Sequence, residues 1–394
     1  MADSITLSLG AATAASRTCW WNGSAFIPTS VAADTSVARV FRGWANPSKE
    51  GITPAVGDTW LRRGSSAPVN LILDTDLDTD VDDIFDVKAA LVYHQEGIAN
   101  LLGIACTTTN MKGPGSIRAS GNYYGYAVPV ASIKPLVNDF HPPNTGAPTT
   151  SAYFDLLYAS PYDHTGIGLA DTVTDSTTAY RTWLANSSGN VHIVMTGYGK
   201  AFRLFLDSAA DGISGLTGFE LAAAKIACVW VVTGAEYPTS GGDWNVIQNP
   251  ADWSYIAANC TCPIAWIPTS LGQNVGIVGG TYLNSRRPST DPGRVCMAVW
   301  AVPHPTPDGR PPWGVNGIQL AVEGYQKFGC TTVAGTNVIN ASTGANVFTP
   351  GAGLHTYLVA PSPSQNTAML AHHQSLVAAD AVSGSYTWNG SAWV

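Results

Sequence analysis

Charged residues are scarce in this chain of 394 residues: they make up 12% of it, about half of the roughly 25% usual for soluble globular proteins. The formal net charge is −8, so the chain lacks the excess of positive charge that binds a phosphate backbone. No apolar run approaches the roughly 20 residues that span a bilayer, and Met1-Ala2-Asp3 lacks the basic start of a secretory signal. We therefore expect a soluble protein that binds neither nucleic acid nor membrane and carries no readable cellular address.

Patterns that bind transition metals are also missing. The seven cysteines include no CxxC pair, and the closest approach to one is Cys260-Thr261-Cys262. Buried, reduced thiols explain these residues better than a zinc site or a disulfide framework. The eight histidines form no HxH or HExxH spacing. The hydrophobic fraction of 45%, in contrast, is ample for one large core.

The character of the chain changes near residue 69. Residues 1–68 are rich in Ser, Thr, Ala and Gly, which is typical of a small β-rich appendage. From residue 69 to about 380, apolar runs alternate with amphipathic stretches, and this rhythm predicts βαβ units in an α/β domain with a mostly parallel sheet. Residues 381–394 form a separate tail. We expect strands at 69–73, 101–108, 191–195, 225–232 and 263–267, and helices at 82–95, 200–208 and 250–259.

The tail repeats a segment from the appendage. Trp21-Asn22-Gly23-Ser24-Ala25-Phe26 returns as Trp388-Asn389-Gly390-Ser391-Ala392-Trp393. Asn-Gly favours a two-residue hairpin loop, which would place Cys19 opposite Phe26 and Tyr386 opposite Trp393. A lone hairpin is marginal in water, so each copy should pack on another surface. The repeat is either surface decoration or an attachment element for a homo-oligomer or a larger assembly.

An acidic segment follows the first expected strand of the α/β domain. It reads Asp74-Thr75-Asp76-Leu77-Asp78-Thr79-Asp80-Val81-Asp82-Asp83 and leads into the helix at 82–95. Ligands bind at this end of a strand in open α/β sheets. Carboxylates this close repel one another unless a cation or raised pKa values relieve them, and Ca²⁺ and Mg²⁺ prefer oxygen ligands. An EF-hand is excluded because its Gly and Glu are missing, and a solvated acidic turn is the simpler alternative.

Together with four later segments, the acidic segment resembles the opening pattern of the nucleoside hydrolases, the calcium-dependent N-ribohydrolases. The matching residues are Asp74-Thr75-Asp76 and Asp82-Asp83; 102–110, which ends at Asn110; 191–197, which contains Thr196; Asp243-Trp244-Asn245 with Asn249-Pro250; and 287–292, which contains Asp291, ahead of a helix at 294–302. The resemblance covers roughly residues 69–380. It implies a doubly wound, mostly parallel sheet and hydrolysis of the N-glycosidic bond of ribonucleosides.

The same resemblance implies a role for each matched residue. A calcium ion would be held by Asp76, Asp83, Asp291 and the backbone carbonyl of Thr196. Asp76 would also accept the proton of the attacking water. The ribose would be oriented by Asp82, Asn110, Asp243 and Asn245. Trp244 would contact the sugar or base, or else belong to the core.

The linker between the two halves of the acidic segment departs from the family pattern. It is two residues longer than the commonest form, so Asp78 is an alternative to Asp76 as the key carboxylate. We choose Asp76 because it keeps the same distance from the strand end. Asp80, within the linker, would bind calcium or cap the helix.

Two further departures affect the expected chemistry. Asp243 stands where the family has a Glu, and Thr290 stands where many members have the His that protonates the leaving base. His304 is near in sequence, but the general acid stays unassigned and the nucleobase preference stays open.

A second hypothesis belongs to a different functional class. The low charge and the repeated aromatic segment resemble parts of phage structural proteins. The chain would then be a virion component, such as a tail or capsid appendage, that uses a nucleoside hydrolase-like fold with reduced or no activity. The sequence leaves the location of the protein open, as cytoplasmic or virion-associated.

Overall fold

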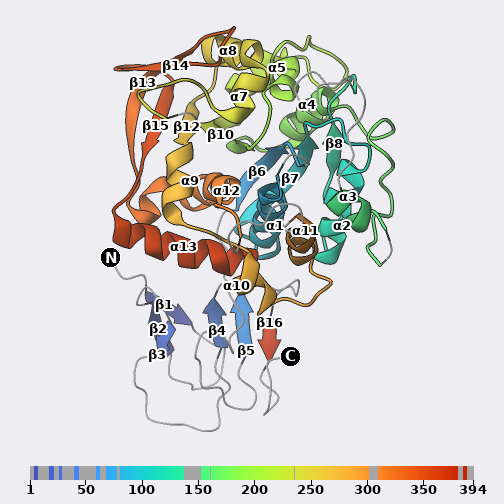
Figure 1. Cartoon of the computed structure of the whole chain (residues 1–394), viewed down its shortest axis with the longest axis vertical. Helices are drawn as coiled ribbons and strands as arrows, with labels where there is room; N and C mark the ends of the chain where they lie inside the picture. The colour runs from blue at the N-terminus through green and yellow to red at the C-terminus, as the bar shows by residue number, and fades with distance from the viewer. Residues whose placement is uncertain are drawn as a thin grey trace. The chain divides into compact units, whose positions relative to one another are not determined.

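The computed structural model of the chain describes residues 68–77, 80–136, 152–159, 161–234, 236–300 and 309–379, together with short strands in the terminal segments (Figure 1). The chain divides into two compact units, Ser65–Ala381 and Met1–Gly64 with Val382–Val394. Across the described part of the chain, no helix is both long and apolar enough to cross a membrane.

The large unit is built on one mixed sheet whose described strands number ten, in the order β11-β14-β13-β15-β12-β10-β9-β6-β7-β8. These strands are β6 (Val69–Thr75), β7 (Ala99–Cys106), β8 (Val130–Ser132), β9 (Val191–Met195), β10 (Ile226–Gly234), β11 (Thr239–Ser240), β12 (Ile264–Pro268), β13 (Thr331–Ile339), β14 (Asn346–Pro350) and β15 (His355–Val359). Pairing is parallel from β15 to β8, whereas β13, β14 and β11 pair antiparallel. The predicted α/β class with a mostly parallel sheet is confirmed.

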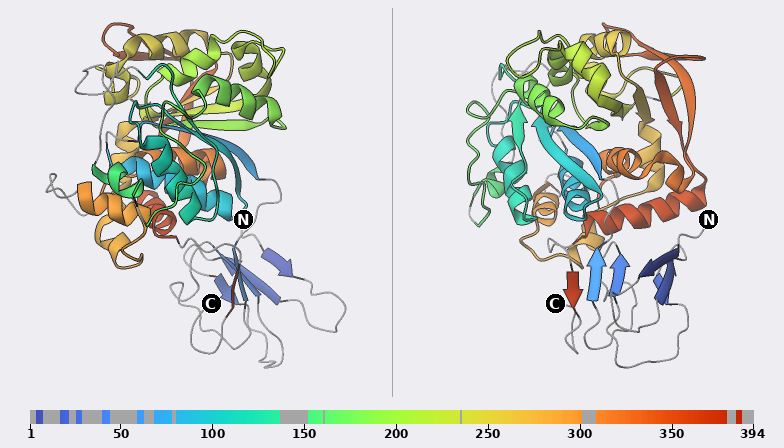
Figure 2. Two further views of the ribbon diagram at one scale, coloured as in Figure 1. Left: turned by 90° about the vertical axis from the view of Figure 1, so that its right-hand side faces the viewer. Right: turned by 180° about the vertical axis from the view of Figure 1, so that it is seen from behind.

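Helices cover both faces of this sheet (Figure 2). They are α1 (Asp82–Gln95), α2 (Gly113–Tyr123), α3 (Ala152–Leu157), α4 (Ser176–Asn186), α5 (Lys200–Leu206), α6 (Gly218–Lys225), α7 (Trp244–Gln248), α8 (Pro250–Asn259), α9 (Thr269–Val275), α10 (Gly280–Asn284), α11 (Pro292–Trp300), α12 (Trp313–Glu323) and α13 (Pro363–Val377), with a 3₁₀ turn at Tyr325–Phe328. The central strands are therefore apolar on both faces, and Leu71, Ile72 and Leu73 are all fully buried.

The order of strands explains where a ligand can bind. From β6 the chain builds outward through β7 and β8, then returns to the other side of β6 and continues through β9, β10 and β12. The reversal lies between β6 and β9, where Asp74 pairs with Met195. A crevice opens at such a reversal, outside the carboxyl ends of the strands. The acidic segment after β6 and Thr196 after β9 both begin there.

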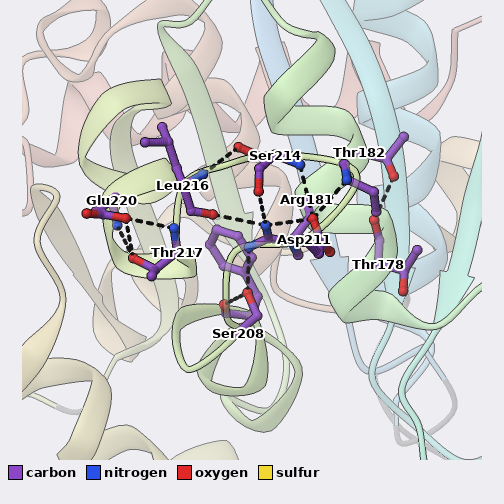
Figure 3. Close-up of polar contacts among 11 residues, drawn as sticks. Thr178, Arg181, Thr182, Ser208, Asp211, Ser214, Leu216, Thr217 and Glu220 are labelled. Atoms are coloured by element: carbon purple, nitrogen blue, oxygen red, sulfur yellow. Dashed lines mark hydrogen bonds and ion pairs between the residues drawn. The ribbon is translucent and has the colours of Figure 1, made fainter.

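A buried cation organises the connection between α5 and α6 (Figure 3). Arg181 of α4 is 1% exposed. Its guanidinium donates two hydrogen bonds of 2.8 Å to the carboxylate of Asp211 and one of 2.9 Å to the hydroxyl of Ser208. It also donates to the backbone carbonyls of Ser214 and Leu216, at 2.9 Å each. The guanidinium of Arg181 therefore supplies hydrogen-bond donors to backbone carbonyls in a connection that has no regular secondary structure.

The strands that the structure describes in the terminal unit form two three-stranded sheets. One has the order β1 (Ser4–Leu7), β2 (Arg17–Trp21), β3 (Phe26–Pro28), and the other has the order β16 (Ser385–Thr387), β5 (Thr59–Arg62), β4 (Val40–Gly43). The two ends of the chain therefore share one sheet through the pairing of β16 with β5.

The predicted two-residue loop of the first hairpin is wrong. Trp21 lies opposite Phe26 and Cys19 opposite Pro28, so four residues separate the strands. Loops of four residues are also common in hairpins, and the local preference of Asn-Gly does not decide between the two lengths. For the second copy, Tyr386 pairs with Trp60, and Trp393 lies outside the described residues.

Candidate functional site

A cavity of about 350 Å³ opens at the reversal point of the sheet. It is lined by Asp76, Asp80, Asp82, Asp83, Thr196, Val232, Asp243, Trp244, Asn245, Thr269, Arg310, Trp313 and Gly314. Six of the predicted site residues are thus brought together from β6, α1, β9 and the start of α7: Asp76, Asp82, Asp83, Thr196, Asp243 and Asn245. Two predicted site residues, Asn110 and Asp291, do not line the cavity, and Asp78 and His304 lie outside the described residues.

Asp76 is placed by a close approach between two strand ends. It follows β6 directly and is 2% exposed. A Cβ atom on Gly197 would lie 2.5 Å from the Cβ of Asp76 and 2.6 Å from its backbone nitrogen. Only glycine allows this distance, so the glycine after Thr196 keeps the carboxylate of Asp76 close to the end of β9.

Asp83 is held by two hydroxyl groups. Its Oδ1 accepts hydrogen bonds from Thr75 Oγ1 at 2.6 Å and from Thr196 Oγ1 at 3.1 Å. Burial, and then the negative charge of Asp76, raise the pKa of Asp83 well above its usual value. The two hydroxyls lower this pKa but do not offset the effect of burial. The carboxylate is therefore fixed in orientation and costly to ionise.

Further negative charge lies beside it on α1. Burial and the neighbouring Asp80 and Asp83 raise the pKa of Asp82, and burial with Asp83, Asp82 and Asp76 raises that of Asp86. Asp86 is 1% exposed, and none of the described residues donates a hydrogen bond of normal geometry to either of its oxygens, although the N–H of Val315 lowers its pKa. An oxygen-only cluster whose carboxylates raise one another's pKa suits a hard divalent cation such as calcium.

Asp291, the other predicted carboxylate ligand, is paired with basic side chains. Its Oδ2 accepts hydrogen bonds from Lys88 Nζ at 2.8 Å, Arg287 Nε at 3.0 Å and the hydroxyl of Tyr124 at 3.3 Å. The side chain is fully buried. Although burial alone would raise it, Lys88 and then Arg287 hold the pKa of Asp291 below its usual value. Two cations already neutralise this carboxylate, so it does not fit a metal ligand in its present position.

A complete metal site is not assembled by side chains alone. Within the described ranges, no three His, Cys, Asp or Glu side chains lie close enough together to hold an ion. The donors that fit calcium are the carboxylates of Asp76 and Asp83 with the carbonyl of Thr196. That carbonyl accepts a hydrogen bond from Asn245 Nδ2 at 2.9 Å. Because a carbonyl oxygen has two lone pairs, the second could still bind a cation.

The start of α7 contributes three further residues to the lining of the cavity, Asp243, Trp244 and Asn245. Asp243 caps α7 by accepting the N–H of Asn245 at 3.1 Å, and its other oxygen accepts the hydroxyl of Thr269 at 2.9 Å. Burial raises the pKa of Asp243. Trp244 is 53% exposed, so it is not the core tryptophan that the sequence left as an alternative.

Asn110 and Thr290 lie away from the cavity lining. Asn110 is 2% exposed and its Oδ1 accepts the N–H of Lys112 at 2.9 Å, at the approach to α2. Thr290 is exposed, and its backbone carbonyl accepts the hydroxyl of Tyr162 at 3.0 Å. The position that would carry a general acid in the family therefore holds no acid and is not among the residues that line this cavity.

The sequence did not indicate two cavity residues that precede and begin α12. Arg310 forms an ion pair with Asp80, and Trp313 donates from Nε1 to the carbonyl of Thr269 at 3.1 Å. Asp80 therefore binds an arginine, and α1 begins without a side-chain cap. No motif in the sequence marks Arg310 or Trp313, because they follow the matched segments and contact residues more than 40 positions away.

Comparison with known proteins finds similarity in structure but not in sequence. No protein-family model and no curated protein sequence matches the chain. The inosine-uridine preferring nucleoside hydrolase from Bacillus anthracis is 13% identical, with 78% of this chain and 99% of that chain covered and a TM-score of 0.55. The purine-preferring ribonucleoside hydrolase from Gardnerella vaginalis is 14% identical, with coverage of 78% and 99% and a TM-score of 0.53.

A third similar structure is the type III effector protein XopQ complexed with adenosine diphosphate ribose. It is 13% identical, with 80% of this chain and 94% of that chain covered and a TM-score of 0.53. At these identities the likeness concerns the fold. The chain therefore has a nucleoside hydrolase-like fold, as the acidic segment and its four companion segments predicted.

Proposed function

We propose that the large unit is an N-glycosyl hydrolase that cleaves ribonucleosides into ribose and base. The observation that carries this proposal is the convergence of six motif residues on one cavity at the reversal point of the sheet. The names of the similar hydrolases support the reaction class. The adenosine diphosphate ribose in the effector complex supports a ribose-containing ligand.

The chain's own residues suggest a division of tasks. Asp76, at the end of β6, accepts the proton of the attacking water. Asp82, Asp243 and Asn245 bind ribose hydroxyls and hold the sugar in the orientation that cleavage requires. Asn245 also orients the carbonyl of Thr196 through its 2.9 Å hydrogen bond.

Calcium is the proposed cofactor, held by Asp76, Asp83 and the Thr196 carbonyl. When bound, it supplies positive charge that acidifies the attacking water and relieves the repulsion between the carboxylates. Asn110 and Asp291 are not needed in this proposal, since neither lines the cavity.

Ribose release from inosine, uridine and a nitrophenyl riboside tests the proposal. Asp76→Asn should lower the rate by at least about 10²-fold, the usual scale for losing a positioned base. Asp155→Asn is the matched control, because its carboxylate is 55% exposed and pairs with Lys112 away from the cavity. If wild type with saturating calcium releases ribose from none of the three substrates, the chain is better described as a structural protein with a hydrolase-like fold.

We also propose a role in assembly for the terminal unit, as part of a homo-oligomer or a virion. Both chain ends contribute strands to it, whereas the residues that line the cavity all belong to the large unit. Deleting 1–64 and 382–394 should abolish assembly in light scattering or particle reconstitution and leave calcium affinity unchanged. Normal assembly of the truncated chain would remove the support for a phage tail or capsid role.

A further inference from the structure

Arg310 is the cation among the residues that line the cavity. Its Nε donates to Asp80 Oδ1 at 3.0 Å and its Nη2 to Asp80 Oδ2. Its backbone N–H and carbonyl both bond to Val278, at 3.0 and 2.8 Å. The guanidinium carbon lies 4.9 Å from the ring centre of Trp300 and 5.2 Å from that of Trp313. The side chain is thus fixed from several directions.

This arrangement leaves part of the guanidinium available to a ligand. Asp80 occupies the edge of the guanidinium formed by Nε and Nη2, and among the described residues none accepts a hydrogen bond from Nη1. The side chain of Arg310 is 21% exposed, and it shares the cavity with Trp244 and Trp313. A rigid donor beside aromatic side chains suits a planar group that carries carbonyl oxygens.

We propose that Arg310 stabilises the departing base and that the site therefore favours uracil-type nucleosides, whose base leaves as an anion, over purine nucleosides. This inference rests on the proposed hydrolysis. The carbon–nitrogen bond of the ribose breaks, and its electron pair passes to N1 of the base. Water attacks the sugar carbon and gives its proton to Asp76, and the base anion later takes a proton from solvent. Arg310 donates hydrogen bonds to the anion's carbonyl oxygen.

The rest of the cavity supports this preference. A departing purine requires a proton donor at its imidazole ring, but the described lining residues include no His, and Thr290 is exposed elsewhere. Arg310 cannot serve as that donor, since a guanidinium keeps its proton. It can, however, stabilise charge that develops on a carbonyl group, which is how fixed donors accelerate many reactions.

Comparing two substrates with different leaving groups distinguishes stabilisation of the departing base by Arg310 from a purely structural role of this residue. Nitrophenolate departs without help, whereas uracil needs its negative charge stabilised. Arg310→Gln should lower kcat for uridine by about 10²-fold, the usual effect of removing one such donor, and change kcat for the nitrophenyl riboside by less than about threefold. The matched control is Arg286→Gln, since Arg286 stacks on Tyr282 at 3.7 Å and does not line the cavity.

Asp80→Asn/Arg310→Gln removes both members of the ion pair, so it tests the role without leaving Asp80 unpaired. The same selective loss on uridine is expected. Equal losses on both substrates in the two variants would overturn the inference. The inference would also be overturned if wild type cleaved inosine faster than uridine, or if it cleaved only the nitrophenyl riboside. Either result would leave the proposed hydrolysis intact. Ribose release from no substrate would defeat both.

Discussion

Replacing Asp83 by Asn should stabilise the calcium-free protein and destabilise it relative to wild type when calcium is present. The side chain is 4% exposed, and its pKa is raised well above 3.8 by burial and by Asp76. Its Oδ1 accepts two hydroxyl hydrogen bonds, and an amide oxygen can accept the same two. The substitution therefore removes the buried charge and keeps the geometry.

The magnitude follows from two opposing effects. Weakening two hydrogen bonds from charged to neutral acceptors costs about 1 kcal/mol each. Avoiding a buried, unrelieved charge gains several kcal/mol, so we expect the free energy of unfolding to rise by about 2 kcal/mol without calcium. For a unit of this size, that is a rise in Tm of about 3 °C. Calcium at about 100 times its Kd would add about 2.7 kcal/mol to wild type alone and reverse the order.

The pH dependence supplies a second check. Because the folded protein holds this proton more tightly than the unfolded chain, the stability contributed by Asp83 is present below about pH 3.8 and lost as the pH rises through the raised pKa. The advantage of Asp83→Asn in chelator should therefore be larger at pH 8 than at pH 5. Calorimetry with chelator and with calcium at both pH values measures it. A variant less stable than wild type in chelator at pH 8 would refute the reasoning.

Two further predictions concern the buried cations of the large unit. Arg181→Met should lower the free energy of unfolding by roughly 2–4 kcal/mol in urea titrations, because two backbone carbonyls and Ser208 lose their donor. The control Arg203→Met should cost less than about 1 kcal/mol, because Arg203 is 37% exposed. Equal costs would contradict the stabilising role of the buried Arg181. Asp291→Asn should lower the free energy of unfolding by about 3 kcal/mol or more, and by more than Lys88→Met does, because only Asp291→Asn leaves two buried cations without a counter-charge. The reverse order would argue against the ion pairs of Asp291 with Lys88 and Arg287.

Periodicity and local signals were sufficient for the central elements. The predicted strand at 191–195 and the helices at 82–95 and 250–259 have the bounds found for β9, α1 and α8. These segments are apolar runs or amphipathic stretches whose pattern depends on neighbours within a few residues. The strands β13, β14 and β15, at the antiparallel end of the sheet, and the helices α12 and α13 were not predicted.

Part of the site could be predicted for the same reason. The apolar run of β6 placed the acidic segment at the carboxyl end of a strand, where ligands bind in open α/β sheets. The resemblance to the nucleoside hydrolases, and not periodicity, singled out Asp76, Asp83 and Thr196. Their convergence on one cavity agrees with the motif, while their calcium-binding role stays a prediction.

Tertiary contacts decided the remaining features. Asp291 meets Lys88 across 203 positions of sequence, and Arg310 meets Asp80 across 230. A local motif cannot indicate such distant partners. Helix packing decides which side chain meets a carboxylate, and that side chain decides whether the carboxylate is neutralised or can bind a cation. Local sequence therefore determined the acidic edge of the sheet, and the packing of α1 and α12 around it determined which of its charges remain available for chemistry.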